Sequence, residues 1–229
     1  MIKKLLFIFL LQMSFATCIC AQTKEKLIAF RDSIAQQTNK FLTVKGLELK
    51  PGLQIEEALK VFESKGWTLK EYDHSSENTH GSILLQGNFF NTPDCEIIIF
   101  PTINNKDIVG SIVISFPEKN SFKTLKNEYE TLKSSLNQKY YINSCTESYG
   151  NENIDDTASD IVKLHLLSEG SATFTTKFIT SEDPNSILLG YTELEILHYN
   201  SDSETKDFVS LMYITSDLII EKLSAIDDL

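Results

Sequence analysis

The side chains best suited to acid–base chemistry are two carboxylates near the end of the chain. Glu193 and Glu195 are separated by one residue, so on a strand both point to the same face. Two such carboxylates can act as proton donor and acceptor in a hydrolase. The same alternation is also typical of a strand face turned to solvent. The sequence alone leaves both interpretations open.

The histidines are the next residues with chemistry to offer, and they are His74, His80, His165 and His198. The first two share a polar stretch but lack a third metal ligand nearby, and the other two alternate with apolar neighbours in expected strands. Two oxygen-rich stretches, 151–155 and 200–204, begin like calcium loops but lack the required Gly and Glu. Nucleophile-elbow, zincin, P-loop and dinucleotide motifs are absent. We therefore assign no catalytic, cofactor-binding or metal residue.

The elements that must position these residues begin with a block between residues 81 and 140. Period-two patterns predict strands at Ser82–Phe90, Cys95–Phe100 and Ile108–Phe116. Short Asn- and Asp-rich turns between them favour an antiparallel meander. Apolar residues then recur every three or four positions over Ser121–Lys139, which indicates an amphipathic helix.

The remaining pattern repeats this order of helix and strands. Helices are expected at 23–41, 54–65 and 216–229, strands at 67–70, 161–167, 172–180, 187–199 and 208–214, and a polar loop at 143–160. The fold class predicted is α+β, with antiparallel strands and helices packed on one face. The arrangement is either two tandem units of a helix and four strands or one sheet of about seven strands.

Composition limits the partners of this chain. Its formal net charge is −11, which argues against nucleic-acid binding because a phosphate-tracking surface needs an excess of Lys and Arg. The acidity is concentrated in the second half, where residues 141–229 carry 4 basic and 17 acidic side chains. This half is either a solubilising surface or a docking surface for a basic partner or a cation.

The first 21 residues have the pattern of a secretory signal peptide. Lys3 and Lys4 precede an apolar run, and small residues lead to Ala21, so cleavage is expected before Gln22. Lipidation of Cys18 or Cys20 is the alternative, although neither follows a good lipobox. No later apolar run is long enough to span a membrane. The mature protein is therefore expected to be periplasmic or extracellular.

Domain boundaries follow from these patterns. After the signal peptide at 1–21, residues 22–42 form a helix that packs on the domain or acts as a spacer. Residues 43–229 form the α+β domain, with 43–118 and 119–229 as its two halves.

Two cysteines remain after the signal peptide, Cys95 and Cys145. In an oxidising compartment they either pair or both stay free. We expect them to pair. A bridge would close a loop of ~50 residues and contribute about 4 kcal/mol in the chain-entropy model.

Short phrases in this chain resemble a group of uncharacterised secreted proteins from Bacteroidetes. They comprise Val44–Leu49, Ile55–Gly66, Gln86–Phe89, Cys95, Phe116–Pro117, Leu125–Tyr140, Cys145, Glu147, Tyr213–Ile214 and Asp227–Leu229. The pair Leu47-Glu48 departs from the apolar-Pro pair of the group. The resemblance implies a fold like that of the β-lactamase-inhibitor protein, with helices on an antiparallel sheet in tandem. It implies no enzyme activity.

The resemblance also suggests two modification sites. Asp156-Thr157-Ala158 and Asp32-Ser33-Ile34 are similar to the O-glycosylation motif of the same bacteria. We expect Thr157 to be the better acceptor because it falls in an expected loop.

Taken together, these patterns predict an exported, non-enzymatic module that binds a protein or envelope component. A hydrolase that uses Glu193 and Glu195, or a purely structural envelope protein, are the alternatives.

N-terminal sequencing of the exported protein tests the leader. Signal peptidase should remove the first 21 residues, so the mature chain should begin at Gln22. Recovery of intact Met1, or of a lipid on Cys18 or Cys20, would contradict this cleavage site.

Overall fold

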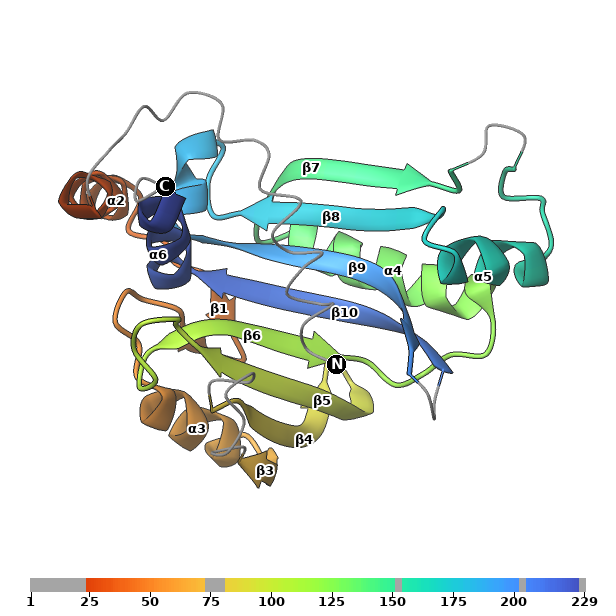
Figure 1. The fold of residues 1–229 in the computed structure, drawn as a ribbon, viewed down its shortest axis with the longest axis horizontal. Coiled ribbons are helices and arrows are strands. Elements are labelled where there is room, and N and C mark those ends of the chain that lie inside the picture. Colours follow the sequence, from red (N-terminus) through yellow and green to blue (C-terminus); the bar gives the residue numbers. More distant parts are fainter. Residues whose placement is uncertain (1–23, 73–80, 151–153, 202–204, 227–229) are drawn as a thin grey trace.

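The computed structural model describes residues 24–72, 81–150, 154–201 and 205–226. They form an α+β fold around one eight-stranded sheet in which every neighbouring pair is antiparallel (Figure 1). The helices are α2 (Lys24–Thr38), α3 (Ile55–Ser64), α4 (Phe122–Asn137), α5 (Asp160–Ser168), η1 (Pro184–Leu189, a 3₁₀ helix) and α6 (Ser216–Ile226). The predicted fold class is confirmed.

The strands of the sheet come in two runs of four. The first run is β3 (Thr68–Tyr72), β4 (Ile83–Phe89), β5 (Thr92–Pro101) and β6 (Val109–Ser115). The second run is β7 (Tyr141–Ser148), β8 (Thr173–Ile179), β9 (Gly190–Asn200) and β10 (Thr205–Thr215). The short β1 (Thr43–Val44) and β2 (Leu47–Glu48) pair with each other.

The two runs meet at their last strands. The strand order is β3-β4-β5-β6-β10-β9-β8-β7, so β6 pairs with β10 at the middle of the sheet. The register there places Ile112 opposite Tyr213 and Ile114 opposite Leu211. A helix precedes each run, α3 in the first and α4 in the second, and α5 is inserted between β7 and β8. One continuous sheet is the result.

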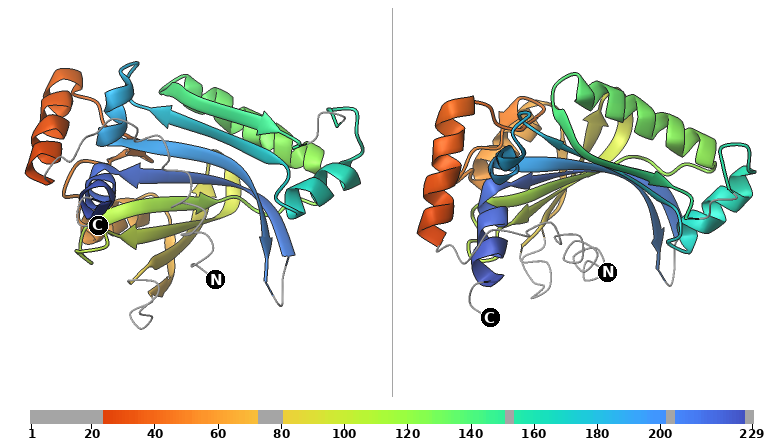
Figure 2. Two further views of the ribbon diagram at one scale, coloured as in Figure 1. Left: turned by 45° about the horizontal axis from the view of Figure 1, so that its top comes forward. Right: turned by 90° about the horizontal axis from the view of Figure 1, so that it is seen from above.

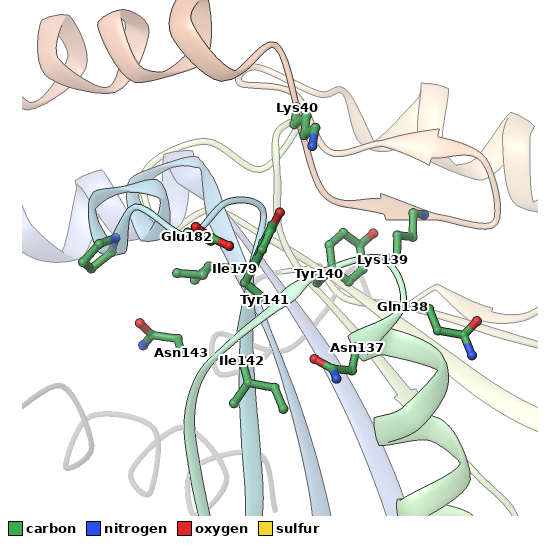
Figure 3. Close-up of a pocket in the computed structure, with 11 residues that line it drawn as sticks. Lys40, Asn137, Gln138, Lys139, Tyr140, Tyr141, Ile142, Asn143, Ile179 and Glu182 are labelled. Atoms are coloured by element: carbon green, nitrogen blue, oxygen red, sulfur yellow. The ribbon is translucent and has the colours of Figure 1, made fainter.

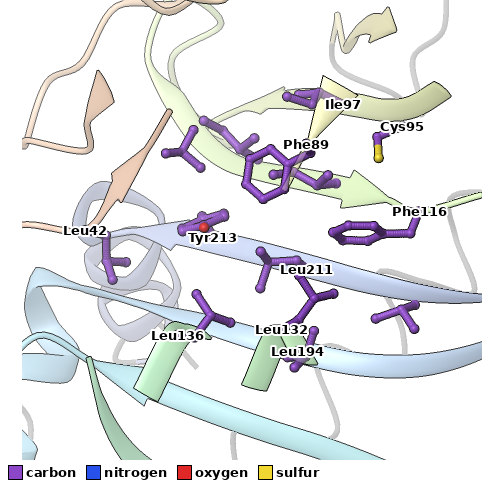
Figure 4. Packing of buried hydrophobic residues seen from close by; sticks show 14 of the residues in the cluster. Leu42, Phe89, Cys95, Ile97, Phe116, Leu132, Leu136, Leu194, Leu211 and Tyr213 are labelled. Carbon is purple, nitrogen blue, oxygen red and sulfur yellow. The ribbon is translucent and has the colours of Figure 1, made fainter. Parts of the chain in front are cut away.

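The main hydrophobic core lies between one face of this sheet and the helices α3, α4 and α5. Leu125, Leu132 and Leu136 of α4 are buried against strand residues such as Leu194 and Leu211 (Figure 4). Ser121 caps α4, since its hydroxyl accepts a hydrogen bond from the Thr124 amide. The stripe predicted for this helix therefore faces the core.

A second, smaller core covers one end of the opposite face. There α2, η1 and α6 enclose Ile34, Leu189 and Ile214, among others. Arg31 of α2 pairs with Asp217 of α6 at 3.1 Å, and Asp217 also accepts a hydrogen bond from the Gly52 amide. The N-terminal helix is thus packed on the domain.

Figure 2 shows how the helices divide between the faces. In its right-hand view α4 lies above the arched sheet. Helix α6 extends downward at one end of the sheet, and the last part of β9 and the first part of β10 bend downward at the other end. Helices α2 and η1 lie at the same end of the sheet as α6, and the three helices enclose the second core there.

Two predicted elements were wrong. Residues 161–167 lie in helix α5 rather than in a strand, and the predicted polar loop at 143–160 contains most of strand β7. In the short α5 segment, Lys163 and His165 alternate with apolar residues, and this alternation resembles the period of a strand. Strand β7 is exposed along its whole length, so it lacks the alternation that marks a half-buried strand.

The predicted disulfide between Cys95 and Cys145 was also wrong. Both cysteines are free, with Cys95 on β5 in the core and Cys145 exposed on β7. Five strand-to-strand steps separate β5 from β7, which is about 24 Å at the usual strand spacing. A disulfide needs Cα atoms within about 7 Å.

Within the described ranges, no helix is both long enough and apolar enough to cross a membrane.

Truncation of a core leucine tests the burial of α4. Leu125→Ala should lower the free energy of unfolding by about 2–5 kcal/mol because it empties a fully buried site. The matched control Thr131→Ala, on the exposed side of the same helix, should change it by less than about 0.5 kcal/mol. Urea unfolding followed by circular dichroism gives both values, and equal effects would contradict this packing.

Candidate functional site

The two carboxylates singled out in the sequence lie on the sheet face opposite α4. Leu194 and Ile196 point into the main core, so Glu193 and Glu195 point the other way. The register places Lys177 of β8 opposite Glu193 and Thr175 opposite Glu195. On the other side of β9, Met212 and Ser210 of β10 occupy the corresponding positions.

This register builds rows of side chains across the face. One row runs Leu84, Ile98, Val113, Met212, Glu193, Lys177, and its neighbour runs Gln86, Glu96, Ser115, Ser210, Glu195, Thr175. We call the part of this surface beyond the α6 end the open face. The first row is apolar from β4 to β10 and charged on β9 and β8, whereas the second row is polar throughout.

The carboxylate pair has a distinctive electrostatic setting. Lys177 Nζ lies 3.3 Å from Glu193 Oε1, and the Thr175 hydroxyl donates to Glu195 Oε1 at 3.2 Å. The pKa of Glu195 is raised to about 7, mainly by burial and then by the neighbouring Glu193 charge, against the opposing effects of Thr175 and Lys177. Burial also raises the pKa of Glu193, against the effect of Lys177. The two groups are therefore suited to share a proton near neutral pH.

A cavity of about 710 Å³ lies elsewhere, at the C-terminal end of α4 and the start of β7 (Figure 3). Its lining includes Lys40, Lys139, Tyr141, Asn143 and Glu182. Lys139 donates to the Thr43 hydroxyl, and the Tyr140 hydroxyl accepts a hydrogen bond from the Thr43 amide. The carboxylate pair does not line this cavity.

A second cavity, of about 310 Å³, lies beside Arg31 between α2 and α6. The Glu221 carboxylate accepts hydrogen bonds there from the amides of Ile103 and Asn104. These two hydrogen bonds give the Glu221 carboxylate partners within the chain and hold the β5–β6 connection against α6.

The other candidates from the sequence do not converge. His165 lies on α5 beside Glu169 at 3.3 Å, and His198 contacts Asp207 at 2.8 Å across β9 and β10. His74, His80, Asn151, Asn153, Asp202 and Glu204 lie outside the described residues. Across the described residues, no three His, Cys, Asp or Glu side chains gather in a metal-binding arrangement.

The cysteines and modification sites have contrasting surroundings. Cys95 is buried, which raises its thiol pKa to about 11. Cys145 is exposed, and its Sγ accepts hydrogen bonds from Lys133 Nζ at 3.4 Å and the Thr176 hydroxyl at 3.3 Å. Thr157 is exposed in a turn, where its hydroxyl donates to Asp155, and Ser33 is exposed on α2.

Sequence reasoning missed the residues that surround the pair. Lys177, Thr175 and Ser210 come from two other strands, and only the register brings them beside Glu193 and Glu195. The alternation of Thr173, Thr175 and Lys177 on β8 is the one signal that could have indicated a polar strand face.

Comparison with protein-family models, curated proteins and solved structures gives no match in any of the three.

The pH dependence of stability tests the setting of Glu195. Because folding raises its pKa from 4.5 to about 7, the stability it contributes is complete below pH 4.5 and is lost as pH rises through about 7. Between pH 4.5 and about 7, the free energy of unfolding of the wild type should fall by about 1–3 kcal/mol through Glu195. The Glu195→Gln variant should lack this fall. The exposed Glu96→Gln serves as the matched control and should retain the loss. Identical pH profiles for all three proteins would contradict the raised pKa.

Proposed function

We propose that this protein is an exported, non-enzymatic binding module that holds a protein or another envelope component on its open face. The observation that carries the proposal is the face itself. One side of an eight-stranded sheet has α2, η1 and α6 packed on it at one end only, among the described residues. Beyond that end, Leu84, Ile98 and Glu96 of the first run are partly or fully exposed, whereas Glu193 and Ser210 of the second run are buried.

The chemistry of the open face supports protein binding. Leu84, Ile98 and Phe208 are half-buried aliphatic and aromatic groups, and polar side chains lie beside them. Apolar contact area with a surrounding polar rim is the usual composition of a protein interface. The charges of Lys177, Glu193 and Glu195 would help to orient the bound partner.

Export is part of the same proposal. It is supported by the leader pattern at residues 1–21, which lies outside the described residues. We place the mature protein in the periplasm or outside the cell. The resemblance to secreted Bacteroidetes proteins, and to the tandem fold it implies, belongs to this proposal and supports a role without catalysis.

A hydrolase is the second candidate, because of one observation. Glu195 has a pKa raised to about 7 beside a second carboxylate, which is a setting used for general acid catalysis. Against this, the cavities beside β7 and beside Arg31 are lined by other residues.

Retention of envelope components by the immobilised mature protein tests the proposal. Ile98→Glu places a charge on the open face and should reduce the retained species at least about tenfold. The matched control Ile161→Glu makes the same change on α5, where Ile161 is 81% exposed, and should retain them.

Two outcomes would contradict the proposal. One is equal retention by both variants while both remain folded by circular dichroism. The other is turnover of a model glycoside or ester that Glu195→Gln abolishes, with nothing retained by the wild type.

A further inference from the structure

The two edges of the sheet differ in how well they are protected. At one edge, β3 is five residues long and carries Lys70 and Glu71. At the other, β7 is eight residues long, every residue is exposed, and Glu147 is its one charged side chain. Short, charged strands prevent edge-to-edge pairing, whereas a long uncharged edge presents a row of unpaired backbone groups. Of the two edges, β7 is the one suited to pair with another strand.

We propose that β7 pairs antiparallel with β7 of a second copy, so that two sheets join edge to edge about a two-fold axis. A two-fold interface requires a surface that complements itself. In β7 the bulge lies between Ile142 and Ser144, so Ser144 to Ser148 form the regular part of the strand. Within this proposal the register is centred on Cys145, so Ser144 lies opposite the partner's Thr146 and Glu147 lies opposite the partner's Asn143.

The charges near β7 agree with this arrangement. Lys40 and Lys139 lie at its start, with Glu182 on the same cavity lining, whereas Glu147 lies near its end, where it also pairs with Lys133 of α4. Antiparallel pairing brings the start of each strand beside the end of the other. Like charges are not placed directly opposite each other along the regular part of the strand.

The cavity at the start of β7 provides space for the second copy. Its volume of about 710 Å³ is bounded by Tyr141 and Asn143 of the strand, with Lys139 on one side and Glu182 on the other (Figure 3). Tyr141 and Ile142 are 41% and 42% exposed, respectively. The end of the partner's strand would cover both side chains there.

The helix layer leaves room for this pairing. Helix α4 packs on β8, β9 and β10, with its densest contacts on β9. In the joined sheet, five strand-to-strand steps would separate the two copies of β9, or about 24 Å. Packed helices need only 8–10 Å between their axes. The two copies of α4 therefore do not collide.

Cys145 reports on the register directly. Residues directly opposite in an antiparallel pair have Cα atoms about 4.5–5.5 Å apart, which is within disulfide range. Copper(II)–phenanthroline oxidation of the mature chain should therefore join two Cys145 thiols into one disulfide, with two protons released and the two electrons taken by copper. Moving the thiol along the same exposed strand, in Cys145→Ser/Ser148→Cys, should slow cross-linking at least about tenfold because this position is not opposite itself.

Sedimentation of the Cys145→Ser protein tests the pairing without a covalent link. A reversible dimer should form over a concentration series, and adding Thr146→Lys should raise its dissociation constant at least about tenfold. Adding Thr131→Lys instead, which introduces the same charge on the exposed side of α4, should leave the constant unchanged.

A monomer at every concentration, or equal cross-linking through residues 145 and 148, would overturn the proposal. So would equal effects of the two lysine substitutions. These outcomes are independent of whether the open face retains an envelope component.

Discussion

The pairing of β6 with β10 is the interaction on which the rest of this structure depends. Each of these strands ends a run of four, and their hydrogen bonds turn two four-stranded sheets into one. On one side, Ile112, Ile114, Leu211 and Tyr213 of these strands form the middle of the main core. The same pairing makes the opposite side continuous, so rows of side chains cross from β4 to β8 without a break.

The continuous sheet explains why α3 and α4 share a core although they precede different halves of the chain. Phe62 of α3 and Leu132 of α4 belong to the same buried cluster. Within the second run, β8 and β10 flank β9, so Glu193 is a neighbour of Lys177 on one side and of Met212 on the other. Glu193 is buried there, and the raised pKa of Glu195 follows mainly from burial.

Much of the fold could be predicted from the sequence because half-buried elements leave a periodic pattern. Helices α2, α3, α4 and α6 and the central strands were located in this way. Strand β7 and helix α5 were not, since β7 is exposed on both faces and in α5 Lys163 and His165 alternate with apolar residues as in a strand. The predicted disulfide between Cys95 and Cys145 was wrong for a different reason. Two cysteines in an oxidising compartment suggest a disulfide. Whether they can meet depends on the order of the strands in the sheet, which local sequence patterns do not determine.

Amide hydrogen exchange of the mature protein tests the joined sheet most directly. If β6 and β10 hold the halves together, the amides of Ile112, Ile114, Leu211 and Tyr213 should exchange only through global unfolding, all with the same free energy. Exchange of the β7–β10 run at a clearly lower free energy than the β3–β6 run would show two units that open separately. That result would contradict a single cooperative sheet held together by the β6–β10 pairing.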